Sequence, residues 1–392
     1  MDTPSFNTKV ECPLCGSVNE FETIRVGAYV ETGRDTDFCP IGVKWRFEEY
    51  RGYNPLVFFV ATCPKCYYSR EFNDAFKGWK SDSTFKTYRL KRIKTLHLEE
   101  LAQDNAIIKR LGQSIDLDKS PNESAIAKLL LTIRDETLNE RPSNLDLGRF
   151  YLRIAWVMRQ LDANGPPQRS SAVEPFSAID QKFEVWAEGL ASWTTYRDEL
   201  FGELNRSLAD GDRKAGSEQS KIESSYAEIK EQLLAYEEKC RSLGDELTGI
   251  IKSHRAIAVG PAVGRPEAPF GGKGSLYEFL TDLKRDWSET PLDEREALNR
   301  AVEGYQKALE AGKEVSAGNL QIQVCYLIAE LSRRAGEFAK AREFFNSVIK
   351  VGQEYVREHQ ADKSRTALAR KILDLAAEQT QAAKEAAAGV TT

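Results

Sequence analysis

Four cysteines near the amino terminus have the spacing of a metal site. They form two Cys-Pro-x-Cys pairs, Cys12 with Cys15 and Cys63 with Cys66. A tight turn at Cys-x-x-Cys lets two thiolates reach one ion, and two such turns complete a tetrahedral shell of four sulfurs. Because that shell leaves no open position, the pattern predicts a structural ion rather than a catalytic one. Zinc is the expected occupant, and iron in a rubredoxin-like shell is the alternative.

A second polar group lies between the two cysteine pairs. Asp35, Asp37 and Cys39 alternate along one short segment. Alternating side chains of an extended chain share a face, so two carboxylates and a thiol there can bind a cation or activate a nucleophile. The structural alternative is that the carboxylates accept backbone N–H groups of the loop while the thiol packs beneath the ribbon.

The remaining ionisable residues offer less chemistry. The three histidines lack partners at ligand spacing, so surface or helix-face positions are expected for His97, His254 and His359. A basic run follows the second cysteine pair, and such runs beside a zinc ribbon can contact phosphate backbones. A solvated helix face is the alternative, because the first hundred residues are close to neutral. The basic run consists of Lys86, Arg89, Lys91, Arg92 and Lys94.

Composition and charge exclude several classes of protein. The net charge is −5 and the pI is near 5.6, so the whole chain gives no case for nucleic acid or an anionic membrane. No apolar run approaches the roughly 18–20 residues that cross a bilayer, and the first residues lack the pattern of a signal peptide. We therefore expect a cytoplasmic protein without membrane contact.

The elements that position these residues follow from hydrophobic period and from Gly and Pro. The pattern predicts a mainly α member of the α+β class. A zinc ribbon of short strands is expected over 8–80, and helices over 84–162. An inserted helical hairpin is expected over 172–257, a Gly/Pro-rich linker over 258–275 and tetratricopeptide-like helices over 276–380.

The predicted hairpin rests on two apolar stripes that step by threes and fours, the period of a coiled coil. Two such stripes joined by a short polar loop favour an antiparallel hairpin, with an intermolecular coiled coil as the alternative. The first stripe is Ile179, Phe183, Trp186, Leu190, Trp193, Leu200 and Leu204, interrupted by Arg197. The second stripe is Ile222, Tyr226, Ile229, Leu233, Tyr236, Cys240, Leu243, Leu247 and Ile250.

The chain resembles a bacterial family, domain of unknown function 2225. The resemblance lies in both cysteine pairs, in the Asp-x-Asp-Phe-Cys segment that ends at Cys39, in Asn54-Pro55-Leu56 and in Ile154-Ala155-Trp156. It covers 8–162 well and the end from about 290 more loosely. Two departures are Tyr67, where the family usually has glycine, and a block from about 165 to 275 that looks like an insertion. The resemblance implies the architecture, and the family has no established activity.

Three hypotheses of function follow, in order of preference. The first is a non-enzymatic zinc-binding scaffold that binds protein partners through its helical surface. The second is a nucleic-acid-binding protein that uses the ribbon and the basic run. The third is an enzyme with a site at the Asp-x-Asp-Phe-Cys segment, and no catalytic residue is assigned.

Overall fold

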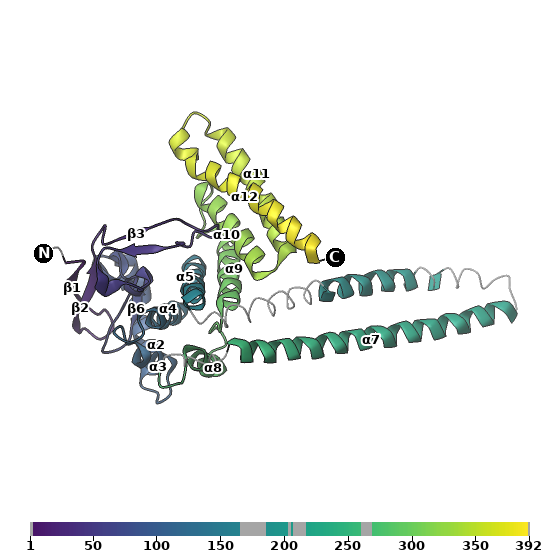
Figure 1. The fold of residues 1–392 in the computed structure, drawn as a ribbon, viewed down its shortest axis with the longest axis horizontal. Helices are drawn as coiled ribbons and strands as arrows, with labels where there is room; N and C mark the ends of the chain where they lie inside the picture. Colours follow the sequence, from purple (N-terminus) through teal and green to yellow (C-terminus); the bar gives the residue numbers. More distant parts are fainter. Residues whose placement is uncertain (1–2, 165–185, 203–204, 207–216, 260–268, 391–392) are drawn as a thin grey trace. The chain divides into compact units, whose positions relative to one another are not determined.

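The computed structural model describes residues 3–164, 186–202, 205–206, 217–259 and 269–390 (Figure 1). The chain divides into two compact units, residues 1–165 with 264–392 and residues 166–263. The fold is mainly helical with short strands near the amino terminus, which confirms the predicted class. The ribbon region and the helices on both sides of the predicted hairpin belong to the first unit.

The strands of the first unit form three separate antiparallel pairs. β1 (Ser5–Glu11) pairs with β2 (Val18–Ile24), β3 (Tyr29–Glu31) with β4 (Val43–Trp45), and β5 (Val60–Thr62) with β6 (Ser69–Glu71). The first and third pairs each carry one Cys-x-x-Cys turn at their connection. Two hairpins therefore present the four cysteines.

The β-prone run from Leu56 to Thr62 is a strand only in its second half. Pro55–Phe58 forms a short 3-10 helix, and β5 starts two residues later. The side chain of Asn54 accepts the backbone N–H of Leu56, which caps the turn, and Pro55 supplies a preset φ at its first position. Local capping therefore overrides β propensity here.

Helices then form the body of the first unit. After α1 (Asp74–Lys77) and a π-helical turn (Phe85–Arg89), the chain continues as α2 (Leu90–Leu101), α3 (Ile107–Ser114), α4 (Pro121–Thr137) and α5 (Asn144–Asn164). The carboxyl-terminal part adds α8 (Leu276–Asp286), α9 (Glu294–Ala311), α10 (Asn319–Ala335), α11 (Phe338–Glu358) and α12 (Lys363–Val390). Among the described helices, none is long and apolar enough to cross a membrane.

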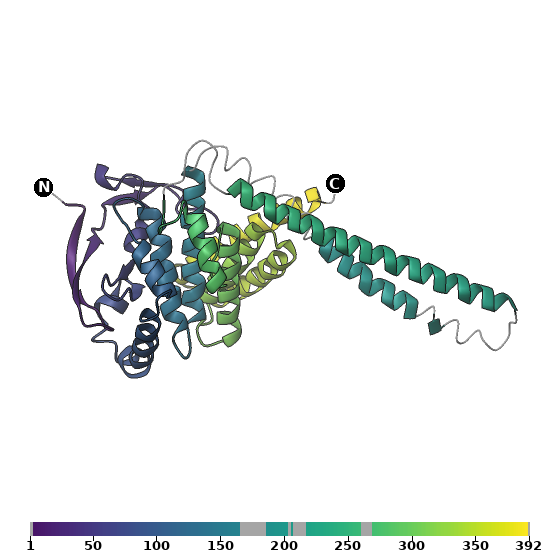
Figure 2. The same cartoon turned by 90° about the horizontal axis from the view of Figure 1, so that it is seen from below.

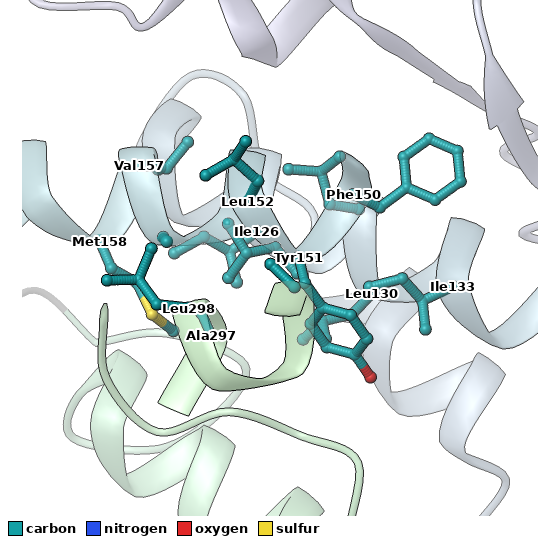
Figure 3. Packing of buried hydrophobic residues seen from close by; sticks show 14 of the residues in the cluster. Ile126, Leu130, Ile133, Phe150, Tyr151, Leu152, Val157, Met158, Ala297 and Leu298 are labelled. Carbon is teal, nitrogen blue, oxygen red and sulfur yellow. The ribbon is translucent and has the colours of Figure 1, made fainter. Parts of the chain in front are cut away.

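One continuous core joins the early helices to the late ones. Side chains of α4 and α5 such as Leu130 and Met158 pack with Ala297 and Leu298 of α9 (Figure 3). Residues before and after the second unit are thus parts of one folded body, and β5 contributes Val60 to the same core.

Helices α5 and α9 touch through their backbones. A Cβ atom at Gly304 would lie 2.7 Å from the backbone N of Gly148, so neither helix leaves room for a side chain there. Ala301 and Tyr305, on the same face of α9, are buried beside this crossing. The small residues of this segment therefore set the close approach of the two helices.

The second unit is an antiparallel pair of helices, one running from residue 186 to 202 and the other α7 (Ser217–Val259). The two lie side by side in both views (Figures 1 and 2). Thr194 Oγ1 donates to Glu237 Oε1 at 2.6 Å, and the rings of Phe201 and Tyr226 meet edge to face at 5.8 Å. The helices therefore run in opposite directions along each other.

Most of the predicted apolar seam is exposed: of its residues whose burial is described, only Leu190, Tyr226 and Cys240 are half-buried. Arg197, expected as an interruption, is buried against α7 and pairs with Glu237. The side chains of Ile222 and Ile250 and the residues before 186 lie outside the described part. The contact runs through Thr194, Lys230 and Glu237, beside the predicted stripe rather than along it. Ten large apolar residues of the two helices are exposed, Trp186 and Leu234 among them. The other eight, here called the hairpin face, are Trp193, Tyr196, Leu200, Ile229, Leu233, Tyr236, Leu243 and Leu247.

Candidate metal centre and the segment beside it

The two cysteine turns have the same backbone geometry. In the first, the N–H of Gly16 donates to Cys12 O at 3.0 Å; in the second, the N–H of Tyr67 donates to Cys63 O at 2.8 Å. Both Gly16 (φ 72°) and Tyr67 (φ 63°) are left-handed. The turn therefore needs a positive φ at this position, and the second turn adopts it without glycine.

The turns bring the four cysteine sulfurs together. The Sγ atoms lie within 4.8 Å of one another, with Cys12 and Cys66 3.6 Å apart and Cys15 and Cys63 also 3.6 Å apart. Four sulfurs about 2.3 Å from one ion would be roughly 3.8 Å apart in a tetrahedron. The cluster can therefore hold a metal ion with little adjustment.

Hydrogen bonds within the cluster act unequally on its thiols, raising the pKa of Cys12 and of Cys66 and lowering that of Cys63. Hydrogen bonds from Cys12 and then Cys66 hold the pKa of Cys63 well below its ordinary value. Ser17 Oγ lies 3.4 Å from Cys63 Sγ, and Asn19 Nδ2 donates to the same sulfur at 3.6 Å. Deprotonated sulfur is the form that binds metal, so these contacts favour the metal-binding form of Cys63.

A buried histidine braces the second turn from α2. His97 Nε2 donates to Cys66 O at 2.7 Å, and His97 Nδ1 lies 2.6 Å from Asp135 Oδ1 on α4. The other oxygen of Asp135 accepts the N–H of Ser69 at 2.8 Å. Burial acts to lower the pKa of His97, but the Asp135 carboxylate raises it overall. Of the two expected positions, surface or helix face, the surface one is wrong: His97 lies on the buried face of α2 and ties the cysteine turn to α2 and α4.

Tyr67 also ties the turn to the helical body. Its ring lies flat over Gly112 of α3, where an added Cβ would be 2.1 Å from Tyr67 Cγ. The aromatic ring thus occupies the space of the missing side chain. This contact gives a reason for tyrosine at a position whose backbone favours glycine.

The Asp-x-Asp-Phe-Cys segment binds two helices of the body. Asp37 is fully buried and accepts Arg159 Nη2 of α5 at 2.6 Å and Trp156 Nε1 at 3.2 Å. It also accepts the N–H of Cys39 at 3.1 Å. A buried carboxylate is stable only when it is paired and hydrogen-bonded in this way. Asp37 therefore fixes the segment to α5.

Asp35 and Thr36 make the connection to α10. Asp35 Oδ1 accepts Arg334 Nη2 at 2.6 Å, and Asp35 Oδ2 accepts Arg159 Nη1 at 3.2 Å. Burial acts to raise the pKa of Asp35, but the N–H of Thr36 and Arg334 lower it overall. The hydroxyl of Tyr326 donates to Thr36 O at 2.9 Å. Two arginines from distant helices thus share this carboxylate.

Between these contacts, Phe38 inserts its ring into the helical body. Its φ is 67°, and its ring centroid lies 5.6 Å from that of Tyr326. It packs against both apolar clusters that surround α10. We call residues Asp35–Cys39 the clamp segment.

Cys39 borders a cavity of about 1280 Å³, which lies beside the β3–β4 pair and is also lined by Phe59, Arg153 and Trp156. Burial raises the pKa of the Cys39 thiol to about 12. At neutral pH the thiol is therefore protonated and a weak nucleophile. Both carboxylates of the segment are held by arginines, which leaves neither as a free base.

The basic run lies on the π-helical turn and on α2, and some of its side chains contact other parts of the fold. Lys86, Lys91 and Lys94 are exposed. Arg89 pairs with Glu136 at 3.7 Å, and Arg92 Nε donates to Leu138 O at 3.1 Å. Among the described contacts only Arg89 faces an acid, because the partner of Arg92 is a neutral carbonyl, so the run still presents the charges of Lys86, Lys91, Arg92 and Lys94.

A family model for uncharacterized proteins conserved in bacteria, DUF2225, matches residues 5–215 and 275–381. The chain belongs to this family. The unmatched stretch, 216–274, contains α7 but not the first hairpin helix, so it is shorter than the insertion expected from 165 to 275. No curated protein and no solved structure matches the chain. In this DUF2225 protein, the four cysteines, the clamp segment and Asn54-Pro55-Leu56 all fall inside the matched ranges.

The contact between Tyr67 and Gly112 predicts energetic coupling. Gly112→Ala is expected to lower the free energy of unfolding by about 1–3 kcal/mol, because the added methyl group overlaps the tyrosine ring. In a Tyr67→Gly background the same change should be neutral or slightly stabilising, since alanine is the better helix former. Urea unfolding of the four metal-loaded proteins measures the cycle. Equal penalties in both backgrounds would contradict the contact.

The clamp segment predicts unequal roles for its two carboxylates. Asp37→Asn is expected to lower the free energy of unfolding by roughly 2–4 kcal/mol, because Arg159 loses its buried counter-charge. Asp35→Asn is the matched control. Its carboxylate is about one-third exposed, and a cost below about 1 kcal/mol is expected. Thermal or urea unfolding tests the ranking, which fails if the two substitutions cost the same.

Proposed function

We propose that this DUF2225 protein is a non-enzymatic zinc-binding scaffold that binds protein partners through its helical surface. The observation that carries the proposal is the hairpin face, where eight large apolar side chains remain exposed on two packed helices. Contiguous apolar surface of this extent marks interaction sites in soluble proteins. The carboxylates of the clamp segment are paired with arginines of the helical body. This structural use of the charges supports a scaffold rather than an enzyme.

Zinc is the ion we propose for the four cysteines. Four thiolates suit zinc or iron, but zinc needs no redox partner and is the common occupant of two Cys-x-x-Cys turns. When bound, the ion would fix the two hairpins relative to each other. The residues that would hold it are Cys12, Cys15, Cys63 and Cys66, with Ser17 and Asn19 donating to their sulfurs.

Elemental analysis tests the metal. We expect one zinc per chain in the purified protein, and Cys63→Ser should lose it because a hydroxyl is a poor zinc ligand. Cys39→Ser is the matched control, a half-buried cysteine outside the cluster, and it should keep the full metal content. Limited proteolysis should then cut between residues 12 and 66 only in Cys63→Ser. Stoichiometric iron, or metal retained by Cys63→Ser, would refute the assignment.

Nucleic-acid binding remains the second hypothesis, supported by the exposed Lys86, Lys91 and Lys94. It predicts affinity for DNA or RNA that falls steeply with salt and is lost when Arg89, Lys91 and Arg92 become glutamine. The ion pair of Arg89 with Glu136 weighs against it, because a charge already paired in the fold contributes less to phosphate binding.

Affinity capture tests the scaffold proposal. A tagged chain in nuclease-treated cytosol is expected to recover specific proteins, untagged copies of itself included. Trp193→Glu with Tyr236→Glu should lose them, because two buried charges in an interface are costly. The matched control is Leu234→Glu, also exposed on α7 but outside the hairpin face. Recovery that is unchanged by the double substitution, or no recovery at all, would refute the proposal.

A further inference from the structure

The hairpin face lies on one side of the helix pair, as the order of residues shows. Trp193 directly precedes Thr194, and Leu200 directly precedes Phe201, both of which contact α7. On α7, Tyr236 directly precedes Glu237, which contacts the first helix. In each helix the exposed residue is therefore rotated about 100° from the contact, in the same sense.

The rotation has the same sense in both helices, and this decides on which side of the pair the exposed residues lie. Two antiparallel helices that expose residues rotated in the same sense from their mutual contact present them on the same face. Ile229 follows the same rule, since it precedes Lys230, whose Nζ lies 5.4 Å from the Phe201 ring centroid. Leu243 follows it too, because it precedes Gly244, which sits against the Trp186 ring. Both helices thus contribute to one apolar surface.

The face consists of pairs of side chains, one from each helix at the same height along the hairpin; each pair is here called a rung. Because Thr194 contacts Glu237, Trp193 lies level with Tyr236. Because Phe201 contacts Lys230, Leu200 lies level with Ile229 at the other end. Between these two rungs, the same register places Tyr196 level with Leu233. Each rung thus has one large apolar side chain from each helix.

One charged residue lies within the first stripe: Arg197, between Trp193 and Leu200, is buried and pairs with Glu237 inside the hairpin. Cys240, the residue of the α7 stripe between Tyr236 and Leu243, is uncharged, and so is Gly189, one turn before Trp193. The eight side chains are between 37% and 68% exposed. At these exposures they present roughly 700 Å² of apolar surface, close to the approximately 800 Å² that each partner buries in a standard stable interface.

We propose that a second copy of this chain covers the hairpin face, so that two hairpins form a four-helix bundle. This inference rests on the proposed partner-binding role of that face. A two-helix hairpin with one apolar side is half of such a bundle, whose core is built from layers of one residue per helix. A twofold axis along the hairpin sets each rung against the same rung of the other copy, with Trp193 over the second copy's Tyr236. The aromatic residues then lie inside the bundle, flanked by aliphatic layers.

Light scattering on the purified, metal-loaded full chain tests the dimer. The expected mass is twice 44.1 kDa at concentrations well above micromolar. Trp193→Ser and Tyr236→Ser should each weaken the dimer at least about thirtyfold, as loss of a central aromatic anchor does. Trp193→Glu with Tyr236→Glu should give the monomer mass. The dimer should persist in Leu234→Glu and in Tyr236→Phe, which keeps the ring.

Circular dichroism and metal content separate loss of association from loss of folding, and both should be unchanged in the serine variants. A dimer that survives the double glutamate substitution would overturn the second copy as occupant. A monomeric wild type whose face still captures other cytosolic proteins would also overturn it, while leaving the scaffold proposal standing. A monomer that captures nothing would end both.

Discussion

The meeting of four cysteine sulfurs is the constraint on which the amino-terminal part depends. It brings residues 12–15 beside residues 63–66, so the segment between them is a loop of roughly fifty residues whose ends meet. An ion bound by all four sulfurs would cross-link this loop and remove on the order of 4 kcal/mol of chain entropy from the unfolded state. The strands here are short, and β3, β4, β5 and β6 have three residues each, too few to hold a sheet alone. With an ion bound, the cluster would supply the order that these strands lack.

The closed loop in turn presents the clamp segment to the helical body. Asp37 and Asp35 meet arginines of α5 and α10, which lie more than a hundred and almost three hundred residues further along the chain. Buried ion pairs add little net stability compared with apolar packing, but an unpaired partner is costly. Such a pair therefore discriminates against any arrangement in which the loop and the two helices are displaced. Phe38 adds apolar contact at the same point, and its left-handed backbone is accepted because both neighbours are fixed.

The sequence was most informative where the chemistry is local. Two Cys-Pro-x-Cys turns predicted the cluster because spacing alone brings each pair of thiolates together, and the helical period predicted most of the helices. The contacts of His97 could not be predicted, since Asp135 and Cys66 O become its neighbours only after α2 and α4 pack. The same holds for Arg159 and Arg334, which carry no local motif. The sequence even offers a different cation, Arg34, directly before Asp35, but in the structure Arg34 pairs with Glu31.

The hairpin shows that a correctly predicted helical period does not by itself predict which residues are buried. A 3.5-residue repeat predicts that its apolar positions are buried, but it does not say how many helices bury them. One partner helix contacts Tyr226 and leaves Ile229 and Tyr236 exposed, because the contact runs through Lys230 and Glu237, one position beyond each. The predicted a/d stripe is therefore rotated away from the contact and is not fully buried within the hairpin. The regular apolar repeat that predicted a hairpin therefore also indicates that the hairpin alone leaves part of its apolar residues exposed.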